Sequence, residues 1–485
     1  MSEPHDHPPR ATIAQVAVIG GGITGLTTAL TLFHHGVDVL LLEAADRLGG
    51  KILTTHMRGT PIDAAADAFL VREPHMTDLC AQLNLTQDLV APATGAAKIW
   101  LRGALRPLPK RQYLGVPLDL EDLEASGLLT PEGVARARQD LEAPADAPSS
   151  DEAVGALIRR RMGDEVMDRL VGPLLGGINA GDADQLSLQA GVPQLAAAAA
   201  HDASLMRSIP QHLRAQGRDP DAPVFLGHPN GTGQIVDAIA TRLGDRVRLN
   251  APVRRLERRG QRWHLDTGDP VEADVVVVTT PSFAAATLLG DTAPAAASML
   301  DEIDYASVVF VTFAFNAGEL PAFDGSGFLV PRNEGLLMTA CSWASSKWAH
   351  LGDGPVGFLR VSAGHSGDTA ALDLDDDELV TRLLDELASV AGVRAAPLEV
   401  RITRWPRSLP QYTPGHLERV AGIESALATE APGITVAGAA YRGLGLPACV
   451  HQGRRAAGWA RECLHAGLAT GEPGTNATDR VVPDG

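Results

Sequence analysis

A glycine motif between two short apolar segments constrains the fold of this chain more than any other feature of its 485 residues. Residues 20–25 match the pattern G-x-G-x-x-G. The apolar, β-branched residues 15–19 before the motif indicate a buried strand, and the helical spacing of residues 23–35 indicates a helix after it. A further apolar run over 37–42 adds a second strand. This order predicts a βαβ unit of a Rossmann-like α/β domain.

Each glycine of the motif has a role in binding a dinucleotide. Gly20 permits the tight turn, Gly22 lets the backbone approach a pyrophosphate, and Gly25 lets helix and strand pack closely. The phosphates would then lie at the positive N-terminus of the helix, beside Ile23 and Thr24. A plain glycine turn is the alternative interpretation.

Glu43 strengthens the dinucleotide interpretation. It ends the second predicted strand, 18 residues after Gly25, where an acid binds the diol of a ribose. A carboxylate at this position would repel the 2′-phosphate of NADP. The sequence therefore favours a dinucleotide without that phosphate.

Two further glycine segments suit a flavin enzyme better than a nicotinamide enzyme. The first follows Glu43 and offers cofactor contacts from Arg47, Gly49, Gly50 and Lys51. The second lies near the end of the chain and offers them from Gly438, Gly445, Leu446 and Pro447. Proline suits the first turn of a helix over 447–464, whose N-terminus would stabilise negative charge on a reduced flavin.

Composition excludes several other classes of protein. The net charge is −18, from 41 basic and 59 acidic residues, which makes nucleic-acid binding a poor fit. The four cysteines contain no C-x-x-C pair, so we expect neither a disulfide framework nor a metal site. The uncharged stretch 11–37 is broken by the glycines, and residues 1–12 do not resemble a secretory signal. We therefore expect a cytoplasmic protein without a transmembrane segment.

Helical and strand signals alternate unevenly after the first unit. Helical spacing dominates 120–216, with helices over 119–138 and 151–175 and a Pro/Ala/Ser-rich loop at 142–150. A further helix is expected at 79–85. The predicted strands of the next region cover 247–250, 253–258, 262–266 and 273–280.

Several segments resemble one family. The chain resembles the FAD-dependent protoporphyrinogen and coproporphyrinogen oxidases of bacterial haem synthesis, which are glutathione-reductase-like flavoproteins related to monoamine oxidases and phytoene desaturases. The opening glycine motif is shared by that whole superfamily. The narrower matches are GGINAGD at 176–182, WPRSLPQYTPGH at 405–416 and GLGLPACVHQG at 443–453. Asn179 departs from the aromatic residue that the family often has, and Ala65–Ala66 stand where it commonly has a glycine before the acid matched by Asp67.

The resemblance implies an α/β fold with a discontinuous FAD-binding domain, a substrate-binding α+β domain and a mostly α-helical insertion. The FAD-binding domain would comprise residues 12–75, 226–290 and 420–466, with a cofactor contact at Val253. The substrate-binding domain would comprise 76–118 and 291–419, and the helical domain 119–225. Residues 1–11 and 467–485 would be disordered tails.

The resemblance also implies the reaction: three rounds of hydride removal to FAD convert coproporphyrinogen III to coproporphyrin III, and molecular oxygen is reduced to hydrogen peroxide. An anionic porphyrinogen needs local cations in so acidic a chain. The residues that we expect to contact it are Arg72, Lys98, Asn179 and Arg207. No catalytic side chain is expected, because the flavin carries the chemistry. A peripheral membrane contact and handover of product to ferrochelatase are further expectations.

Three alternatives remain open from the sequence. Protoporphyrinogen IX oxidation would use the same chemistry on a substrate with two carboxylates rather than four. A flavin amine oxidase of the same superfamily would need an aromatic cage, for which four Tyr and six Trp provide little material. A non-catalytic nucleotide-binding or haem-handling partner would take up no FAD.

Overall fold

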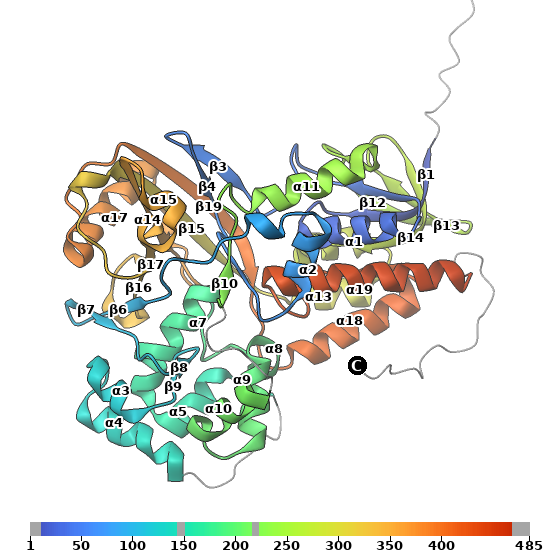
Figure 1. Cartoon of the computed structure of the whole chain (residues 1–485). Helices are drawn as coiled ribbons and strands as arrows, with labels where there is room; N and C mark the ends of the chain where they lie inside the picture. The colour runs from blue at the N-terminus through green and yellow to red at the C-terminus, as the bar shows by residue number, and fades with distance from the viewer. Residues whose placement is uncertain (1–10, 143–150, 216–222, 468–485) are drawn as a thin grey trace, which may run out of the picture.

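The computed structural model describes residues 11–142, 151–215 and 223–467. It contains two seven-stranded sheets and a helical region (Figure 1). The predicted tails and the predicted loop lie outside the described residues, except for residues 11, 142 and 467.

The first sheet contains the predicted βαβ unit. β1 (Thr12–Ile19) pairs in parallel with β2 (Val39–Leu42) and β14 (Val271–Val278), and α1 (Ile23–His34) connects β1 to β2. β20 (Ile434–Val436) pairs in parallel with the end of β14. The remaining strands of this sheet are β11 (Val247–Arg248), β12 (Arg255–Arg259) and β13 (Arg262–Asp266).

Helices cover both faces of this sheet, which explains its unbroken apolar strands. One face packs against α1, α11 (Gly233–Leu243) and α19 (Leu446–His465). The other face packs against α12 (Ser282–Leu289), α13 (Pro294–Asp301) and α18 (His416–Glu430). The carboxyl ends of β1, β2 and β14 therefore meet at one edge, where ligands bind in open α/β sheets.

The second sheet is mixed and presents two different faces. Alternate residues of β15 (Tyr305–Asn316), including Val311 and Phe313, pack with α17 (Asp376–Ala391). Phe310 and Thr312 lie on the opposite face, because side chains alternate along a strand. β15 lies between β19 (Glu399–Pro410), which forms one edge of the sheet, and β18 (Val356–Ala363). Beyond β18 the order continues with β17 (Met338–Ser342), β16 (Gly327–Leu329), β6 (Ala97–Leu101) and β7 (Ala104–Pro107).

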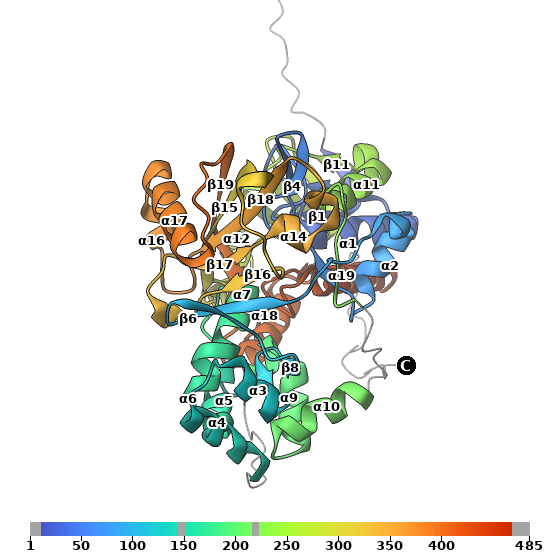
Figure 2. The ribbon, with the colours of Figure 1, turned by 60° about the vertical axis from the view of Figure 1, so that its left-hand side comes forward.

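The helical region lies below both sheets (Figure 2). The predicted helix over 119–138 is wrong as a single element: Gly127 has a φ of +64° and separates α3 (Leu120–Ser126) from α4 (Pro131–Arg138). The predicted helix over 151–175 is likewise interrupted by Gly163, which has a φ of +93°. Its parts are α5 (Val154–Met162), α6 (Asp164–Val166), a π-helical turn at Met167–Val171 and α7 (Gly172–Asn179). The region closes with α8 (Leu188–Gly191), α9 (Pro193–His201) and α10 (Leu205–Ala215).

Two shorter elements begin or end at other residues than the sequence predicted. The helix expected at 79–85 is α2 (His75–Gln82), and the strand expected from residue 253 begins at β12, so Val253 lies in the preceding loop. A hairpin of β3 (Thr54–Met57) and β4 (Thr60–Asp63), and the short ribbon of β5 (Phe69–Leu70) with β10 (Phe225–Leu226), were not predicted. The strands of each sheet lie within the residue ranges expected for the two larger domains. The domain boundaries themselves stay a prediction.

The four cysteines are buried and are not paired with one another. Within the described ranges, no helix combines the length and the apolar character that crossing a membrane requires.

Candidate cofactor and substrate site

The turn between β1 and α1 leaves no room for a side chain at two positions. Gly20 has a φ of +108°, and a Cβ there would lie 2.9 Å from the Thr279 hydroxyl oxygen. A Cβ on Gly25 would overlap the carbonyl oxygen of Gly20. The Thr279 hydroxyl lies within hydrogen-bond distance of the carbonyl oxygens of Ile19 and Gly20, at 2.9 and 3.0 Å. Close backbone packing and the Thr279 hydroxyl therefore restrict these two positions to glycine.

Gly22 differs from these two glycines. Among the described residues, no atom would lie within 4 Å of a Cβ placed on Gly22, so the space in front of it is open. Gly22 is also the N-cap of α1, and no side chain of the described chain caps the first turn. The backbone N–H groups of Ile23 and Thr24 are thus left for an anion at the positive end of the helix. This open cradle fits a pyrophosphate.

Glu43 lies beside the cradle, directly after β2. One carboxylate oxygen accepts a 2.6 Å hydrogen bond from the Gly21 N–H, and the other accepts a 2.8 Å bond from the Ala45 N–H. A carboxylate offers about four acceptor positions, so a ribose diol can be bound in addition. Glu43 therefore also supports the shape of the loop, a role that the sequence did not indicate.

Arg47 is turned toward its own loop. Its guanidinium donates to the carbonyl oxygens of Gly50 at 2.6 Å, Leu48 at 3.1 Å and Ile52 at 3.4 Å. The Gly49 N–H donates to the Gly21 carbonyl at 2.8 Å, which brings the second glycine segment alongside the first. Arg47 thus shapes the loop that the cofactor would contact, and whether it also reaches a phosphate stays a prediction.

A second helix N-terminus lies next to the first. α19 begins at Leu446, with Gly445 as its N-cap and Pro447 in its first turn, and it packs along α1 (Figure 1). Within the described chain, no side chain caps this helix either. A Cβ on Gly453 would lie 2.6 Å from the Thr24 carbonyl oxygen, so glycine allows the close approach of the two helices.

Lys51 adds a cation to this region. Burial lowers the pKa of its ammonium group, while the nearby Cys449 of α19 opposes that effect. Two helix N-termini and one half-buried lysine together make an electropositive site for the phosphates and the reduced ring of a dinucleotide. The residues present therefore fit FAD.

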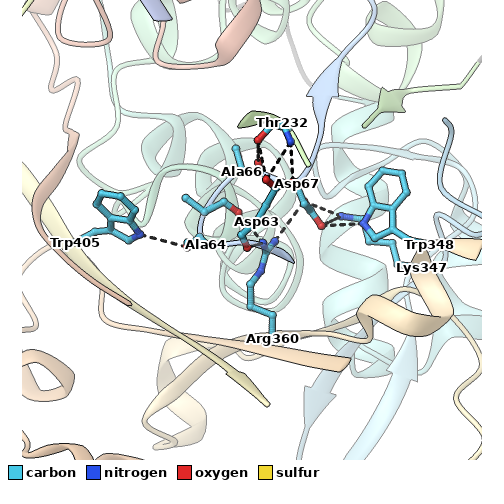
Figure 3. Close-up of polar contacts among 10 residues, drawn as sticks. Asp63, Ala64, Ala66, Asp67, Thr232, Lys347, Trp348, Arg360 and Trp405 are labelled. Carbon is cyan, nitrogen blue, oxygen red and sulfur yellow. Dashed lines mark hydrogen bonds and ion pairs between the residues drawn. The ribbon is translucent and has the colours of Figure 1, made fainter. Parts of the chain in front are cut away.

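A largely buried ion cluster lies between the segment that follows β4 and the second sheet (Figure 3). The Asp67 carboxylate accepts from Lys347 Nζ at 2.9 and 3.1 Å and from the Trp348 indole N–H at 3.0 Å, and it pairs with Arg360 at 3.3 Å. Their side chains are 15–19% exposed. Burial alone would raise the pKa of Asp67, but Arg360 and Lys347 outweigh it and hold that pKa below its usual range.

The cluster fixes the segment that leads away from β4. Arg360 also donates to the carbonyl oxygens of Asp63 at 3.2 Å and Ala65 at 2.6 Å, and Trp405 donates to that of Ala64 at 3.3 Å (Figure 3). The Asp63 carboxylate accepts from the Thr232 N–H at 3.0 and 3.1 Å, and burial raises the pKa of Asp63. Side chains of β18 and β19 thus hold a segment that follows the first domain's hairpin.

The four residues expected to contact substrate do not converge on one point. Arg72 is exposed and donates to the Tyr113 hydroxyl at 3.1 Å. Lys98 lies on the α17 side of the second sheet, 5.8 Å from the centre of the Trp343 ring and 3.7 Å from Asp324. These positions do not bring Lys98 together with Arg72.

The other two expected contacts belong to the helical region. Arg207 of α10 is exposed and pairs with Asp202 at 3.0 Å. Asn179 ends α7, is 6% exposed, and accepts from the Gly181 N–H at 2.8 Å. All four substrate contacts therefore stay predictions.

Sequence reasoning missed Lys347, Trp348 and Arg360. The departure noted before Asp67 was a signal that this segment mattered, but nothing in the sequence linked it to residues 280 positions away. His416, at the end of the 405–416 motif, is buried, and its Nε2–H donates to the Tyr441 carbonyl at 2.8 Å. Burial lowers the pKa of His416 to about 4.

These features define a flavin-dependent oxidoreductase, and comparison with known proteins agrees. The chain belongs to the family of flavin-containing amine oxidoreductases, whose model matches residues 23–458. The predictions of an FAD cofactor and of an oxidoreductase are thereby confirmed.

Two curated relatives share the same enzyme name. Coproporphyrinogen III oxidase of Bacillus subtilis (strain 168) is 34% identical over 456 residues, which cover 91% of this chain and 96% of that protein. The protein of the same name from Mycobacterium tuberculosis (strain H37Rv) is 36% identical over 464 residues, covering 93% of this chain and 98% of that one. These relatives confirm the resemblance drawn from the motifs.

Solved structures show the same fold. A putative protoporphyrinogen oxidase from Exiguobacterium sp. 255-15 has a TM-score of 0.83 and 31% identity, over 94% of this chain and 100% of that one. Cyclohexylamine oxidase from Brevibacterium oxydans has a TM-score of 0.67 at 20% identity, over 93% of this chain and 99% of that one. At that identity the likeness to the amine oxidase concerns the fold alone.

Proposed function

We propose that this chain is an FAD-dependent coproporphyrinogen III oxidase of haem biosynthesis, with molecular oxygen as the electron acceptor and hydrogen peroxide as the by-product. The observation that carries the proposal is the set of relatives of that name, which are 31–36% identical over at least 91% of the chain. The narrower motifs at 176–182, 405–416 and 443–453 lie in the segments where the two sheets and the helical region meet.

When bound, FAD would supply the redox chemistry: three hydride transfers, each accompanied by the loss of one proton from bridge carbon or pyrrole nitrogen, would convert the porphyrinogen to the porphyrin. The chain's own residues bind and orient. The N-termini of α1 and α19 would hold the phosphates and stabilise negative charge, and Glu43 would bind a ribose. The Asp67 cluster would keep residues 63–67 in place beside the reacting groups.

Substrate recognition would depend on cations outside that cluster. Both cations of the cluster already face Asp67, whereas Arg72 donates to the neutral hydroxyl of Tyr113. An arginine with a neutral partner can exchange it for a propionate, which it binds with two parallel hydrogen bonds. We therefore keep Arg72 as the first candidate for a propionate contact.

Steady-state assays in air separate this function from its alternatives. Purified protein is offered coproporphyrinogen III, protoporphyrinogen IX and a panel of primary amines, and porphyrin fluorescence and peroxide are measured. We expect kcat/KM to be highest for coproporphyrinogen III, with three peroxides for each porphyrin. A higher value for protoporphyrinogen IX would reassign the substrate, and turnover of amines alone would reassign the enzyme.

A protein that binds no FAD and oxidises none of these compounds would support the non-catalytic alternative. The cytoplasmic location, a peripheral membrane contact and handover to ferrochelatase stay predictions that these assays do not address.

A further inference from the structure

The loop between β20 and α19 has many backbone groups to satisfy. It runs over residues 437–445 and leads directly to Leu446, the first residue of α19. Gly438 and Gly443 have φ angles of +139° and +110°, so the chain turns sharply at both. Such a loop keeps one shape only when side chains bind its N–H and C=O groups.

One hydroxyl joins the two ends of this loop. The Tyr412 O–H donates to the Ala439 carbonyl at 2.6 Å, and its oxygen accepts from the Gly443 N–H at 2.9 Å. Tyr412 is 2% exposed, and burial raises the pKa of its phenol, so the proton stays on the oxygen. The hydroxyl thus uses its donor and an acceptor position on backbone groups four residues apart.

Tyr412 is itself held from several sides. Its ring stacks on His416 with centroids 4.0 Å apart and planes inclined by 17°. The neighbouring Gln411 side chain donates to the Asn179 carbonyl at 3.1 Å, and the Ser187 N–H donates to the Tyr412 carbonyl at 2.7 Å. A segment that continues from β19 of the second sheet therefore connects the helical region to the loop before α19.

Gln452 braces the same loop from α19. Its side-chain oxygen accepts from the Arg442 N–H at 3.3 Å, and its NH₂ group donates to the Gly443 carbonyl at 3.1 Å. The loop consequently keeps part of its support when the Tyr412 hydroxyl is removed. A variant without that hydroxyl should fold, with the loop less well fixed.

We propose that Tyr412 is a positioning residue, whose hydroxyl sets the orientation of the first turn of α19 against the flavin. The proposal rests on FAD binding and on the part of the proposed function that places this helix N-terminus at the flavin ring. An N-terminus with its N–H groups directed at the ring stabilises the negative charge of the reduced cofactor more than it stabilises the neutral oxidised form. Tyr412 thereby tunes the reduction potential of the enzyme.

The test compares Tyr412→Phe with Tyr305→Phe. Both variants keep the ring and remove a phenol oxygen that accepts from a backbone N–H at 2.9 Å, from Gly443 and from Ser282 respectively. Tyr305 is the first residue of β15, and its hydroxyl accepts from the Ser282 N–H, which lies outside the loop before α19. It therefore controls for the loss of one buried hydrogen bond.

The primary measurement is the midpoint potential of the bound flavin, by equilibrium reduction against a dye. We expect Tyr412→Phe to lose about tenfold in its preference for reduced over oxidised FAD, which corresponds to a potential about 30 mV more negative for a two-electron couple. Tyr305→Phe should lower the unfolding temperature less, because it removes one hydrogen bond rather than two, and should leave the potential at the parent value. Because the dye replaces the porphyrinogen, this result is independent of whether coproporphyrinogen III is the substrate.

An unchanged potential in Tyr412→Phe, or equal shifts in both variants, would overturn the proposal. If Tyr412→Phe does not fold, His416→Gln provides a second route, because it removes the stacked ring and leaves the phenol in place. A shift in the same direction would support the proposal, and a folded His416→Gln protein with the parent potential would contradict it.

Discussion

The cofactor cradle and the Asp67 cluster are built from different chemical groups. On the cofactor side, the chain offers backbone N–H groups from two helix N-termini, shaped by glycines that are neighbours in sequence. The Asp67 cluster instead consists of charged and aromatic side chains from distant segments, such as Asp67 and Lys347, which lie 280 residues apart. The cradle therefore depends on the space left by glycines, and the cluster depends on the balance of its charges.

The difference predicts two kinds of sensitivity. A site made of backbone fails when a side chain is added, because a Cβ meets carbonyl oxygens that cannot move away. A site made of buried ions fails when one charge is removed, because its partners are left without compensation. The comparison would be wrong if an added side chain left the glycine cradle intact, or if loss of one charge left the ion cluster stable.

The largest effect should follow from adding one carbon to the first glycine turn. In Gly25→Ala, the new Cβ would overlap the Gly20 carbonyl, so β1 and α1 must separate and FAD binding should be lost. The yield of yellow protein and its unfolding temperature measure this. Gly458→Ala is the matched control: no atom of the described chain lies within 4 Å of that Cβ, so the variant should gain up to about 1 kcal/mol of stability from helix propensity. A yellow, stable Gly25→Ala protein would refute the packing argument.

Removing one charge from the Asp67 cluster should have the next largest effect. Asp67→Asn keeps the size of the side chain but leaves Lys347 and Arg360 facing each other without an anion. We expect the free energy of unfolding to fall by about 3 kcal/mol. Urea denaturation measures it, with Asp245→Asn as the control, because the pair of Asp245 with Arg246 is at the surface and contributes little. Equal stability of the two variants would mean that the cluster is not a buried network.

As the pH falls, the protein should lose the stability linked to His416 before it loses the stability linked to Asp67. The folded-state pKa of His416, about 4, lies below its ordinary value of 6.5, so the unfolded chain binds the proton more readily. The corresponding stability is present above about pH 6.5 and is lost as the pH falls toward 4, by about 2–3 kcal/mol. Because the pKa of Asp67 is lowered in the folded protein, the contribution of Asp67 to the free energy of unfolding is retained until the pH falls below about 4.

Urea denaturation of the parent and of His416→Gln between pH 4.5 and 7 tests this order. The parent should lose stability across the range, and the variant should show a flatter profile. Parallel profiles would show that His416 does not titrate as its burial requires.

Glu43→Ala should weaken FAD binding by roughly tenfold to a hundredfold or more, because charge-assisted hydrogen bonds of this kind contribute about 1.5–3 kcal/mol. Part of the loss would come from the Gly21 and Ala45 N–H groups, which also lose their acceptor. Titration of apo-protein with FAD measures it, and Asp46→Ala in the same exposed loop is the control. Parent-like affinity in Glu43→Ala would remove Glu43 from the ribose site.

Arg72→Ala should produce the smallest change. We expect the KM for coproporphyrinogen III to rise about three- to tenfold with a smaller effect on kcat, because a carboxylate contact is equally strong in the ground and transition states. Added salt should weaken binding less in the variant than in the parent. Lys110→Ala, an exposed cation, controls for net charge, and an Arg72→Ala protein with parent kinetics at both salt concentrations would place Arg72 outside the pocket.

The cofactor side could be predicted from sequence because its residues are contiguous and its chemistry follows from glycine geometry. The glycine motif, Glu43 and the start of α19 lie where the pattern predicted them. The Asp67 cluster could not be predicted in this way, because the partners of Asp67 come from β18 and from the segment after β17, and spacing does not encode that contact. The same limit explains why the helices of the insertion were predicted too long: helical spacing continues across Gly127 and Gly163, but their left-handed backbone does not.

The most direct test of this account is an anaerobic titration of the yellow protein with limiting coproporphyrinogen III. If FAD accepts every hydride that leaves the substrate, each molecule converted to coproporphyrin III should bleach three equivalents of flavin. The absorbance of the oxidised flavin and the porphyrin band should then change together. Absence of bleaching, or porphyrin formation while the flavin stays oxidised, would contradict the account.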